Sequence, residues 1–221
     1  KKHSVQSFLL PTLAHHNHDK FEIFAFADLK KSDLISLKYK SHVDHWIRTE
    51  KMNDDELVQK IRSLGIDILV DLAGHTAGNR LKIFSQKPAP VSLSWFIGYG
   101  YTTGLSAIDY FLTDTVVGPD GSEYFFSEKP WKLKNLLAVW DPNNIKFEKN
   151  TPLPALKKGF ITFGTLTRAI RINNKVIKAW ANILTKVPNS KLIINSKSFF
   201  YDKKTIDDFT QKFKEHGISK S

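Results

Sequence analysis

The most informative stretch of the chain is Ile66-Asp-Ile-Leu-Val-Asp-Leu-Ala-Gly-His-Thr-Ala-Gly-Asn-Arg80. Its apolar first half predicts a buried strand over residues 66–72, and a glycine-rich turn with His75 and Thr76 follows. A short helix is expected over residues 79–86. Glycine lets the backbone approach a ligand, and parallel strands end in loops that line a ligand crevice. The stretch therefore predicts either a binding site at a strand end or a tight strand-to-helix turn.

Helices and strands alternate on both sides of this stretch. Asn53 and Glu56 have the spacing of a helix capping box, and Gly65 is placed to end that helix. Residues 91–97 have the composition of another strand. Further helices are predicted at 4–13, 174–187 and 202–216, and further strands at 21–26, 108–112, 160–164 and 191–194, with one or two more within 131–139. This alternation predicts an α/β fold with parallel sheets and crossover helices.

A stretch rich in proline and asparagine, from Pro142 to Pro154, predicts a linker, and the α/β pattern restarts after it. We therefore expect one α/β domain with its linker over residues 1–155 and the opening part of a second over residues 156–221. The chain begins at Lys1, without methionine and without a signal peptide, so we expect its ends to be fragment boundaries.

The composition excludes several classes of protein. The chain has 221 residues and no cysteine, so disulfide scaffolds and cysteine-based metal, redox or nucleophile chemistry are excluded. The absence of cysteine fits a reducing compartment, and we expect a cytoplasmic protein. No apolar run approaches the roughly 18–20 residues of a membrane span, so no membrane partner is expected.

The charge of the chain is compatible with an anionic partner but is not evidence for one. There are 33 Lys and Arg against 22 Asp and Glu, a formal net charge of +11, but only five of the basic residues are arginine. Lysine is a hydrated point charge and a poor bidentate reader of bases. Because the lysines are also spread along the chain, the pattern favours a solvated surface over a nucleic-acid face, which stays an alternative.

Several polar residues are candidates for a site. Thr102, Thr103 and Gly104 belong to a glycine- and hydroxyl-rich loop after the strand at 91–97, and its other interpretation is a flexible loop. His3 precedes a helix for which Ser4 is the expected N-cap and Pro11 an expected kink. Asp67 and Asp71 are interpreted as structural polar positions. The three histidines His15, His16 and His18 have poor spacing for a metal, with no supporting cluster of carboxylates or cysteines, so no metal site is expected.

These motifs resemble a known family. The run 66–80, followed by Pro88-Ala-Pro-Val91, Ser94-Trp95, Gly98-Tyr99, Thr102-Thr-Gly104, Ile108-Asp-Tyr110, Leu112-Thr-Asp114 and Ser127-Glu-Lys129, is similar to the catalytic region of the O-linked N-acetylglucosamine transferases. It resembles most closely the SPINDLY-like members of glycosyltransferase family 41. Ile161-Thr-Phe-Gly164 and residues 179–190 are similar to the start of that family's second lobe.

The resemblance implies a GT-B fold, in which two Rossmann-like lobes enclose a nucleotide sugar. It implies an inverting transfer of N-acetylglucosamine, or fucose in some members, from a donor such as UDP-GlcNAc to Ser or Thr of an acceptor protein, while a bacterial branch modifies Asn. No cofactor or metal is expected. His3 takes the place of the family's proposed catalytic histidine, as a base or as a group that orients the acceptor. His75 and Thr76 match one loop of the cleft, and Thr102, Thr103 and Gly104 match a second.

The chain also departs from the family pattern. Relatives show Gly-Tyr-Pro-Gly-Thr-Thr-Gly where this chain has Gly98-Tyr-Gly-Tyr-Thr-Thr-Gly104, and Gly-Ser-Phe-Asn-Asn where it has Gly164-Thr-Leu-Thr-Arg168. The family's nucleotide-binding Gln and Lys pair, His-Thr-Thr-Gly helix start and ribose-binding Asp would follow Ser221. We therefore expect a truncated transferase that is inactive alone. The alternatives are a non-catalytic binding module of the same fold and a basic nucleic-acid-binding domain.

Overall fold

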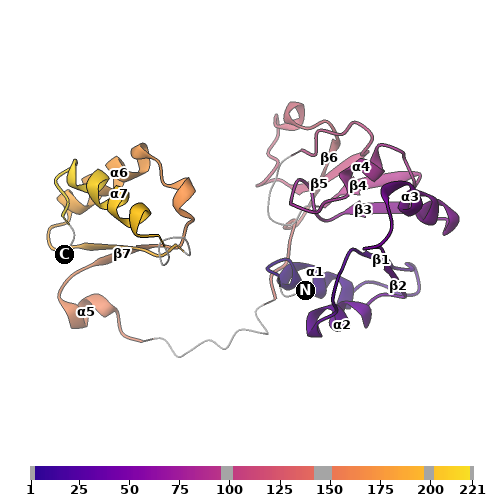
Figure 1. Ribbon diagram of the computed structural model, residues 1–221, viewed down its shortest axis with the longest axis horizontal. Coiled ribbons are helices and arrows are strands. Elements are labelled where there is room, and N and C mark those ends of the chain that lie inside the picture. Colours follow the sequence, from indigo (N-terminus) through magenta and orange to yellow (C-terminus); the bar gives the residue numbers. More distant parts are fainter. Residues whose placement is uncertain (1–2, 96–101, 142–150, 197–201, 220–221) are drawn as a thin grey trace. The chain divides into compact units, whose positions relative to one another are not determined.

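Strand β3 (Ile68–Asp71) forms on the apolar run before the glycine-rich turn and pairs in parallel with β4 (Val91–Ser94). The computed structural model describes residues 3–95, 102–141, 151–196 and 202–219. Contacts within the chain divide it into two compact units, Lys1–Lys146 and Phe147–Ser221. Each unit has its own helices and strands (Figure 1).

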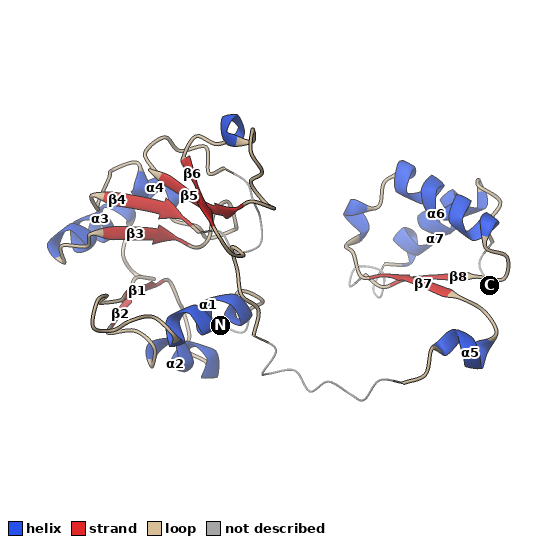
Figure 2. Ribbon diagram, turned by 180° about the vertical axis from the view of Figure 1, so that it is seen from behind, coloured by secondary structure: helices blue, strands red, loops and turns tan. Residues whose placement is uncertain are grey.

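A four-stranded parallel sheet with the order β3-β4-β5-β6 forms the larger sheet of the first unit (Figure 2). The last two strands of this sheet are β5 (Tyr110–Asp114) and β6 (Lys129–Leu133), with the 3-10 turn Glu123–Phe125 between them in the sequence. A separate parallel pair consists of β1 (Phe24–Ala27) and β2 (His45–Arg48). Parallel pairing confirms the predicted α/β fold class.

Helix α3 (Asp54–Ser63) begins at the predicted capping box, where Asn53 accepts the N–H of Glu56 and the Glu56 carboxylate accepts the N–H of Asn53. Its apolar face packs with the short helix α4 (Leu81–Phe84) and with Leu69 of β3 into one core. Predicted as a buried strand, β3 is buried on one face only, because Ile68 and Val70 on the other face are exposed. The core therefore lies between one sheet face and two helices.

Two elements that the sequence patterns leave unassigned are α2 (Leu34–Lys40) and β2. Helix α2 exposes Leu34 and Leu37, so its apolar residues give no buried stripe. Helix α1 (Gln6–Ala14) begins after Val5, and no side chain caps it, so the predicted Ser4 cap is wrong. Pro11 lies inside α1, where it cannot donate to the Ser7 carbonyl, and that carbonyl accepts the N–H of Asp141 instead.

The second unit pairs β7 (Thr162–Thr165) in parallel with β8 (Lys191–Ile194). Helix α6 (Asn174–Lys186) and helix α7 (Lys203–Lys214) pack their apolar faces together, and the buried residues of this core are Ile172, Ile177, Ala181, Phe209 and Phe213. Within the predicted linker, Pro154 starts the short helix α5 (Pro154–Lys158). A 3-10 turn covers Ala169–Arg171.

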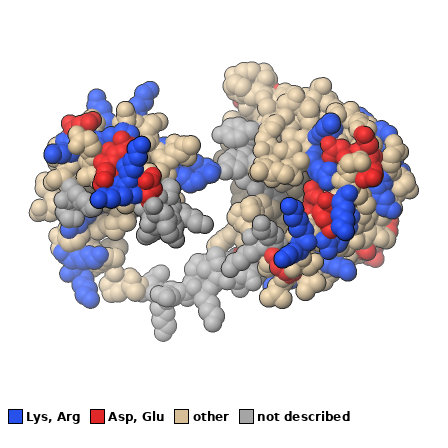
Figure 3. Space-filling model, in the orientation of Figure 1, with Lys and Arg blue, Asp and Glu red and all other residues tan. Residues whose placement is uncertain are grey.

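The formal charge is divided very unevenly between the units. Residues 1–146 carry 18 Lys and Arg against 17 Asp and Glu, whereas residues 147–221 carry 15 against 5. The net charge of the chain therefore resides almost entirely in the second unit. On the faces seen in Figure 3, acidic side chains are interspersed among the basic ones. No helix among the described residues is long and apolar enough to cross a membrane.

Candidate functional site

Two candidate loops leave the same edge of the larger sheet. Strands β3 and β4 are parallel neighbours, so the turn at residues 72–80 and the loop that leads to Thr102 both follow carboxyl ends of strands. This edge is where open α/β sheets bind their ligands. The structure thus places the His75–Thr76 and Thr102–Gly104 segments after adjacent strands, while residues 96–101 of the second loop lie outside the described part.

The turn after β3 exposes the side chains of His75 and Thr76. The Thr76 hydroxyl donates to the carbonyl of Ala73 at 2.7 Å, and the Asn79 amide donates to the carbonyl of Thr76 at 2.8 Å. Gly78 has a φ of 79°, in the left-handed region that favours glycine. The turn is therefore closed by its own hydrogen bonds, with the imidazole on its outside.

Asp71, the last residue of β3, fixes this turn through hydrogen bonds to its backbone. Its carboxylate is buried and accepts the N–H groups of Ala73 at 3.0 Å and Gly74 at 3.1 Å. The Ser94 hydroxyl at the end of β4 donates to the same carboxylate at 2.8 Å. Asp71 therefore joins the ends of two strands to the His75 turn, which is the structural role that its alternation with apolar residues suggests.

Glu128 anchors the second candidate segment, and the sequence analysis assigned it no role. Its buried carboxylate accepts the N–H of Thr103 at 2.7 Å and the hydroxyl of Thr102 at 2.6 Å, and the hydroxyl of Thr103 also donates to it. Ser127 contacts the Thr102 hydroxyl oxygen at 2.9 Å. The two motifs Thr102–Gly104 and Ser127–Lys129 thus meet in space, 25 residues apart in sequence.

The ionised form of Glu128 suits this arrangement. Burial raises the pKa of its carboxyl group, but the hydrogen bonds from Thr102 and Thr103 outweigh burial, so the pKa lies below its usual value. An ionised carboxylate only accepts hydrogen bonds, and Thr102 donates one to it and Thr103 two. The ionised carboxylate of Glu128 therefore fixes the segment Thr102–Gly104. Gly104, at the end of this segment, is exposed and has a φ of 74°.

Asp114 ends β5 in the way that Asp71 ends β3. Its carboxylate accepts the N–H groups of Val116, Val117 and Leu137 at 2.8–2.9 Å, and those from Val117 and Leu137 are the main cause of its lowered pKa. The Trp95 indole donates to the Leu137 carbonyl at 3.1 Å. These bonds tie together the carboxyl ends of three neighbouring strands, so the edge that carries the His75 turn is pre-organised.

Arg80 attaches the same turn to the smaller sheet. Its guanidinium donates to Asp28 at 3.1 Å, to Asp54 at 2.7 Å and to the carbonyl of Met52 at 2.9 Å. The hydrogen bonds to Asp28 and Asp54 raise its pKa further. Asp28 follows β1 and Asp54 begins α3, so one side chain connects the His75 turn to two other elements.

His3 lies apart from these contacts. It is exposed, and its Nδ1 accepts the N–H of Val5 at 3.3 Å. Within the described residues, no hydrogen bond joins His3 to His75 or to the segment Thr102–Gly104. The His75 turn lies at the carboxyl end of β3, whereas the segment Thr102–Gly104 is bonded to Glu128, directly before the amino end of β6, and His3 is connected to neither.

The match to the model named Glycosyl transferase family 41 covers residues 2–151. The chain belongs to this family. The matched range includes every residue proposed for the site. Family membership agrees with the resemblance drawn from the motifs and with the α/β fold.

Two curated relatives and one solved structure show how this family 41 chain compares. It is 34% identical to a probable SPINDLY UDP-N-acetylglucosamine–peptide N-acetylglucosaminyltransferase from Oryza sativa subsp. japonica, over 96% of this chain, and 35% identical to the SPINDLY protein of Solanum lycopersicum, over 90%. It spans 22% of the length of each. A mutant of the Thermobaculum terrenum O-GlcNAc transferase superposes with a TM-score of 0.87 at 28% identity, covering 99% of this chain and 41% of that one. The likeness supports the predicted GT-B class of fold.

Proposed function

We propose that this family 41 chain is the part of a protein O-glycosyltransferase that positions the acceptor hydroxyl and the sugar. N-acetylglucosamine from UDP-GlcNAc is the proposed group transferred, to Ser or Thr of an acceptor protein. The observation that carries the proposal is that buried carboxylates fix two motifs of the family, Asp71 the His75 turn and Glu128 the segment Thr102–Gly104. The names of the relatives support the choice of donor.

The proposed reaction is an inverting displacement. The acceptor oxygen attacks the anomeric carbon, the bond from that carbon to the diphosphate oxygen breaks, and the hydroxyl proton passes to a base. Rigid loops contribute by fixing the reacting atoms before the reaction, which is a large part of what positioning can supply. We propose that His75, Thr76, Thr102, Thr103 and Gly104 line the sugar side, with no metal and no cofactor in the transfer step.

His3 is proposed to act at the acceptor hydroxyl. Because its Nδ1 accepts the N–H of Val5, the neutral ring carries its proton on Nε2. In that tautomer the free side of the ring is a hydrogen-bond donor. The contact therefore supports an orienting role for Nε2–H over the role of base, since a base needs a lone pair on the nitrogen that meets the proton.

The two units are proposed to be unequal parts of a two-lobe enzyme. We assign residues 1–155 to the first lobe with its linker and residues 156–221 to the start of the nucleotide-binding lobe. Because the chain spans 22% of the length of its relatives, we expect it to show no transfer by itself. A cytoplasmic location is proposed on the absence of cysteine alone.

Sugar transfer in a longer chain tests the proposal. A chain that extends these 221 residues to the length of the rice relative is incubated with radiolabelled UDP-GlcNAc and acceptor protein, beside the 221-residue chain. Transfer by the longer chain alone is the expected result. Transfer by the 221-residue chain would contradict the assignment of the units. A longer chain that binds UDP in calorimetry and transfers nothing would instead identify a non-catalytic binding module.

The charge of the second unit supports one other candidate function, the binding of nucleic acid. Its 15 basic residues against 5 acidic ones would attract any polyanion. Binding of that kind releases counterions, so the affinity for random-sequence DNA would fall linearly with salt on logarithmic axes. We expect any such binding to be independent of base sequence, because 13 of these 15 residues are lysine, a poor bidentate reader of bases.

A further inference from the structure

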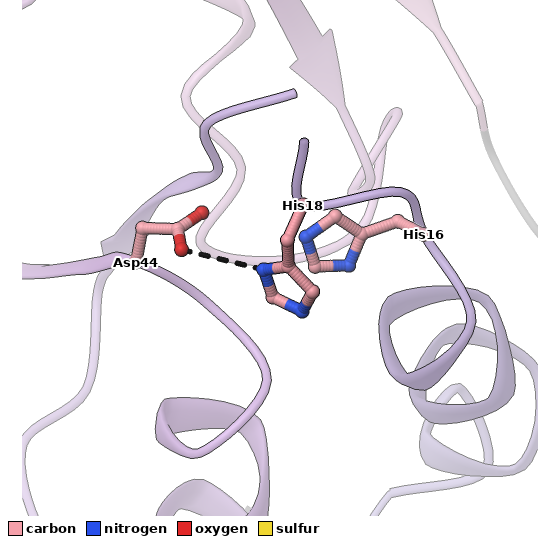
Figure 4. A group of neighbouring side chains, drawn as sticks. All are labelled: His16, His18 and Asp44. Carbon is pink, nitrogen blue, oxygen red and sulfur yellow. Dashed lines mark hydrogen bonds and ion pairs between the residues drawn. The ribbon is translucent and has the colours of Figure 1, made fainter. Parts of the chain in front are cut away.

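A histidine pair and a distant carboxylate meet beside helix α1. The side chains are those of His16 and His18, in the loop after α1, and Asp44, directly before β2 (Figure 4). One ligand atom from each lies within 4.8 Å of the other two. His18 Nδ1 is 3.4 Å from a carboxylate oxygen of Asp44, and the two imidazole rings are 3.8 Å apart between centroids.

His16 is held in the orientation of a metal ligand. Its Nδ1 is 2.6 Å from the carbonyl of Leu13, a contact in which the ring nitrogen must be the donor. The lone pair of the neutral ring is then on Nε2, which is buried and has no hydrogen-bond partner. Metal-bound histidines usually donate their other ring N–H to a carbonyl or carboxylate in this way. In Figure 4 the ring of His16 lies against that of His18, so Nε2 faces the cluster.

A backbone hydrogen bond fixes one carboxylate oxygen of Asp44 and leaves the other oxygen facing the histidines. One oxygen accepts the N–H of Ile23 at 2.7 Å, and the other faces His18. In a tetrahedral site with bonds of about 2.0–2.2 Å, neighbouring ligand atoms are about 3.3 Å apart. The separation between His18 and Asp44 already matches this value, and His16 must approach by only a small movement within the 4.8 Å cluster.

We propose that His16, His18 and Asp44 bind one divalent transition-metal ion, with Zn²⁺ as the first candidate. Two imidazoles and one carboxylate suit zinc and its neighbours, whereas Mg²⁺ and Ca²⁺ prefer oxygen ligands. Three protein ligands leave one position for water. The ion would join the end of α1 to the start of β2, so its role is to stabilise the first unit. This proposal does not depend on whether the chain transfers sugar.

Histidine spacing alone gave the opposite expectation. The prediction of no metal weighed His15, His16 and His18, without a carboxylate to complete the set. The structure replaces His15 with Asp44, which is 26 residues from His18. The His15 ring is exposed, and its Nδ1 contacts the carbonyl of Pro11 at 2.7 Å, away from the cluster. His15 therefore supplies the matched control.

Metal titration of the 221-residue chain tests the proposal. Zn²⁺ is added in calorimetry, and Co²⁺ is added to follow the visible absorption of a tetrahedral complex. We expect one saturable equivalent of metal and an unchanged affinity in His15→Ala. We expect His18→Ala and Asp44→Asn each to weaken binding by about tenfold or more, since even outer-shell changes cost 10–100-fold. The amide introduced by Asp44→Asn would keep an oxygen for the N–H of Ile23, so a folding defect is not expected.

Thermal unfolding with Zn²⁺ provides the second measurement. An ion that binds only the folded chain raises the midpoint of unfolding, and this rise should disappear in His18→Ala and persist in His15→Ala. The proposal is overturned if the unaltered chain binds no stoichiometric metal. It is equally overturned if His15→Ala weakens binding as much as His18→Ala, because the metal would then be held by the exposed histidines of the loop.

Discussion

His3 Nε2 is the atom on which the proposed chemistry depends most. If its proton orients the acceptor, a glutamine at this position can place an amide N–H near the same point. In a longer, active chain we expect His3→Ala to lower kcat by about 100-fold or more, and His3→Gln to recover a large part of the loss. Steady-state kinetics with a peptide acceptor measure both. Equal losses in the two variants would favour a base in place of an orienting donor.

Glu128 offers a second test on one side chain. In Glu128→Gln one acceptor oxygen becomes an NH₂ group, which would face the donors of Thr102 and Thr103. We expect unfolding to become easier by about 1–3 kcal/mol, as measured by urea denaturation. Glu123→Gln is the matched control, because that carboxylate is exposed and pairs with Lys132 on the surface. A similar loss in the control would argue against a special role for Glu128.

Single residues show where sequence reasoning succeeds and where it stops. The His75 turn follows β3 as the sequence pattern predicts, but the anchoring of Thr102 before the amino end of β6 was not predicted. The roles of Glu128 and Asp44 did not follow from any rule, because each acts on residues about 20–26 positions away. Such pairs leave no periodic trace in the chain. The anchor of the loop and the proposed metal ligand set therefore needed coordinates.

Among the elements, those with strong local signals were predicted well. Helix α6 has a helical apolar face, and α3 has a complete capping box, so both were expected close to their observed ranges. Helix α4 is shorter than the predicted 79–86, because the Asn79 side chain accepts the N–H of Leu81 and residues 79–80 form the turn before it. Strand β2 has four residues and helix α2 has no buried apolar stripe, so both lack a pattern that sequence can show.

Arg80 is where the elements of the first unit are most closely connected. The variant Arg80→Lys keeps the charge, but lysine can reach fewer of the carboxylates and carbonyls that the guanidinium joins. We expect a loss of about 2 kcal/mol in the free energy of unfolding. Arg62→Lys is the matched control, since the Arg62 guanidinium donates to a single carbonyl, that of Gln86. Urea denaturation of both variants measures the difference, and equal losses would contradict the connecting role.

At the level of the whole molecule, the two units are expected to respond differently to acid. The pKa values of Asp109, Asp114 and Glu128 in the first unit are all lowered. A lowered folded-state pKa means that the unfolded chain binds more protons in acid. The stabilisation is thus complete above about pH 4–5, near the unfolded pKa values, and is lost as the pH falls through the folded values. We expect unfolding of the first unit to become easier below about pH 4.

Tryptophan fluorescence separates this effect from the second unit. Trp180 belongs to the second unit and the other four tryptophans to the first, so the difference between the unaltered chain and Trp180→Phe reports the second unit. Among the described residues of the second unit, the carboxyl group with a lowered pKa is that of Asp202, and this residue is exposed. Between pH 7 and pH 3, the urea midpoint from Trp180 should fall less than the midpoint of the first unit. An equal fall in both midpoints would contradict the assignment of acid sensitivity to the first unit.

The urea midpoint reported by Trp180 also tests the effect of the large net positive charge of the second unit. In the second unit, 15 basic residues against 5 acidic ones repel one another more when the chain is compact than when it is unfolded. Salt shortens the range of that repulsion to about 10 Å at 0.1 M. Raising NaCl from about 10 mM to 150 mM, where the screening length falls from about 30 Å to 8 Å, should therefore raise the urea midpoint reported by Trp180. The first unit is almost neutral, so its midpoint should stay nearly constant, and a rise of the same size in both units would show that general salt effects are the cause.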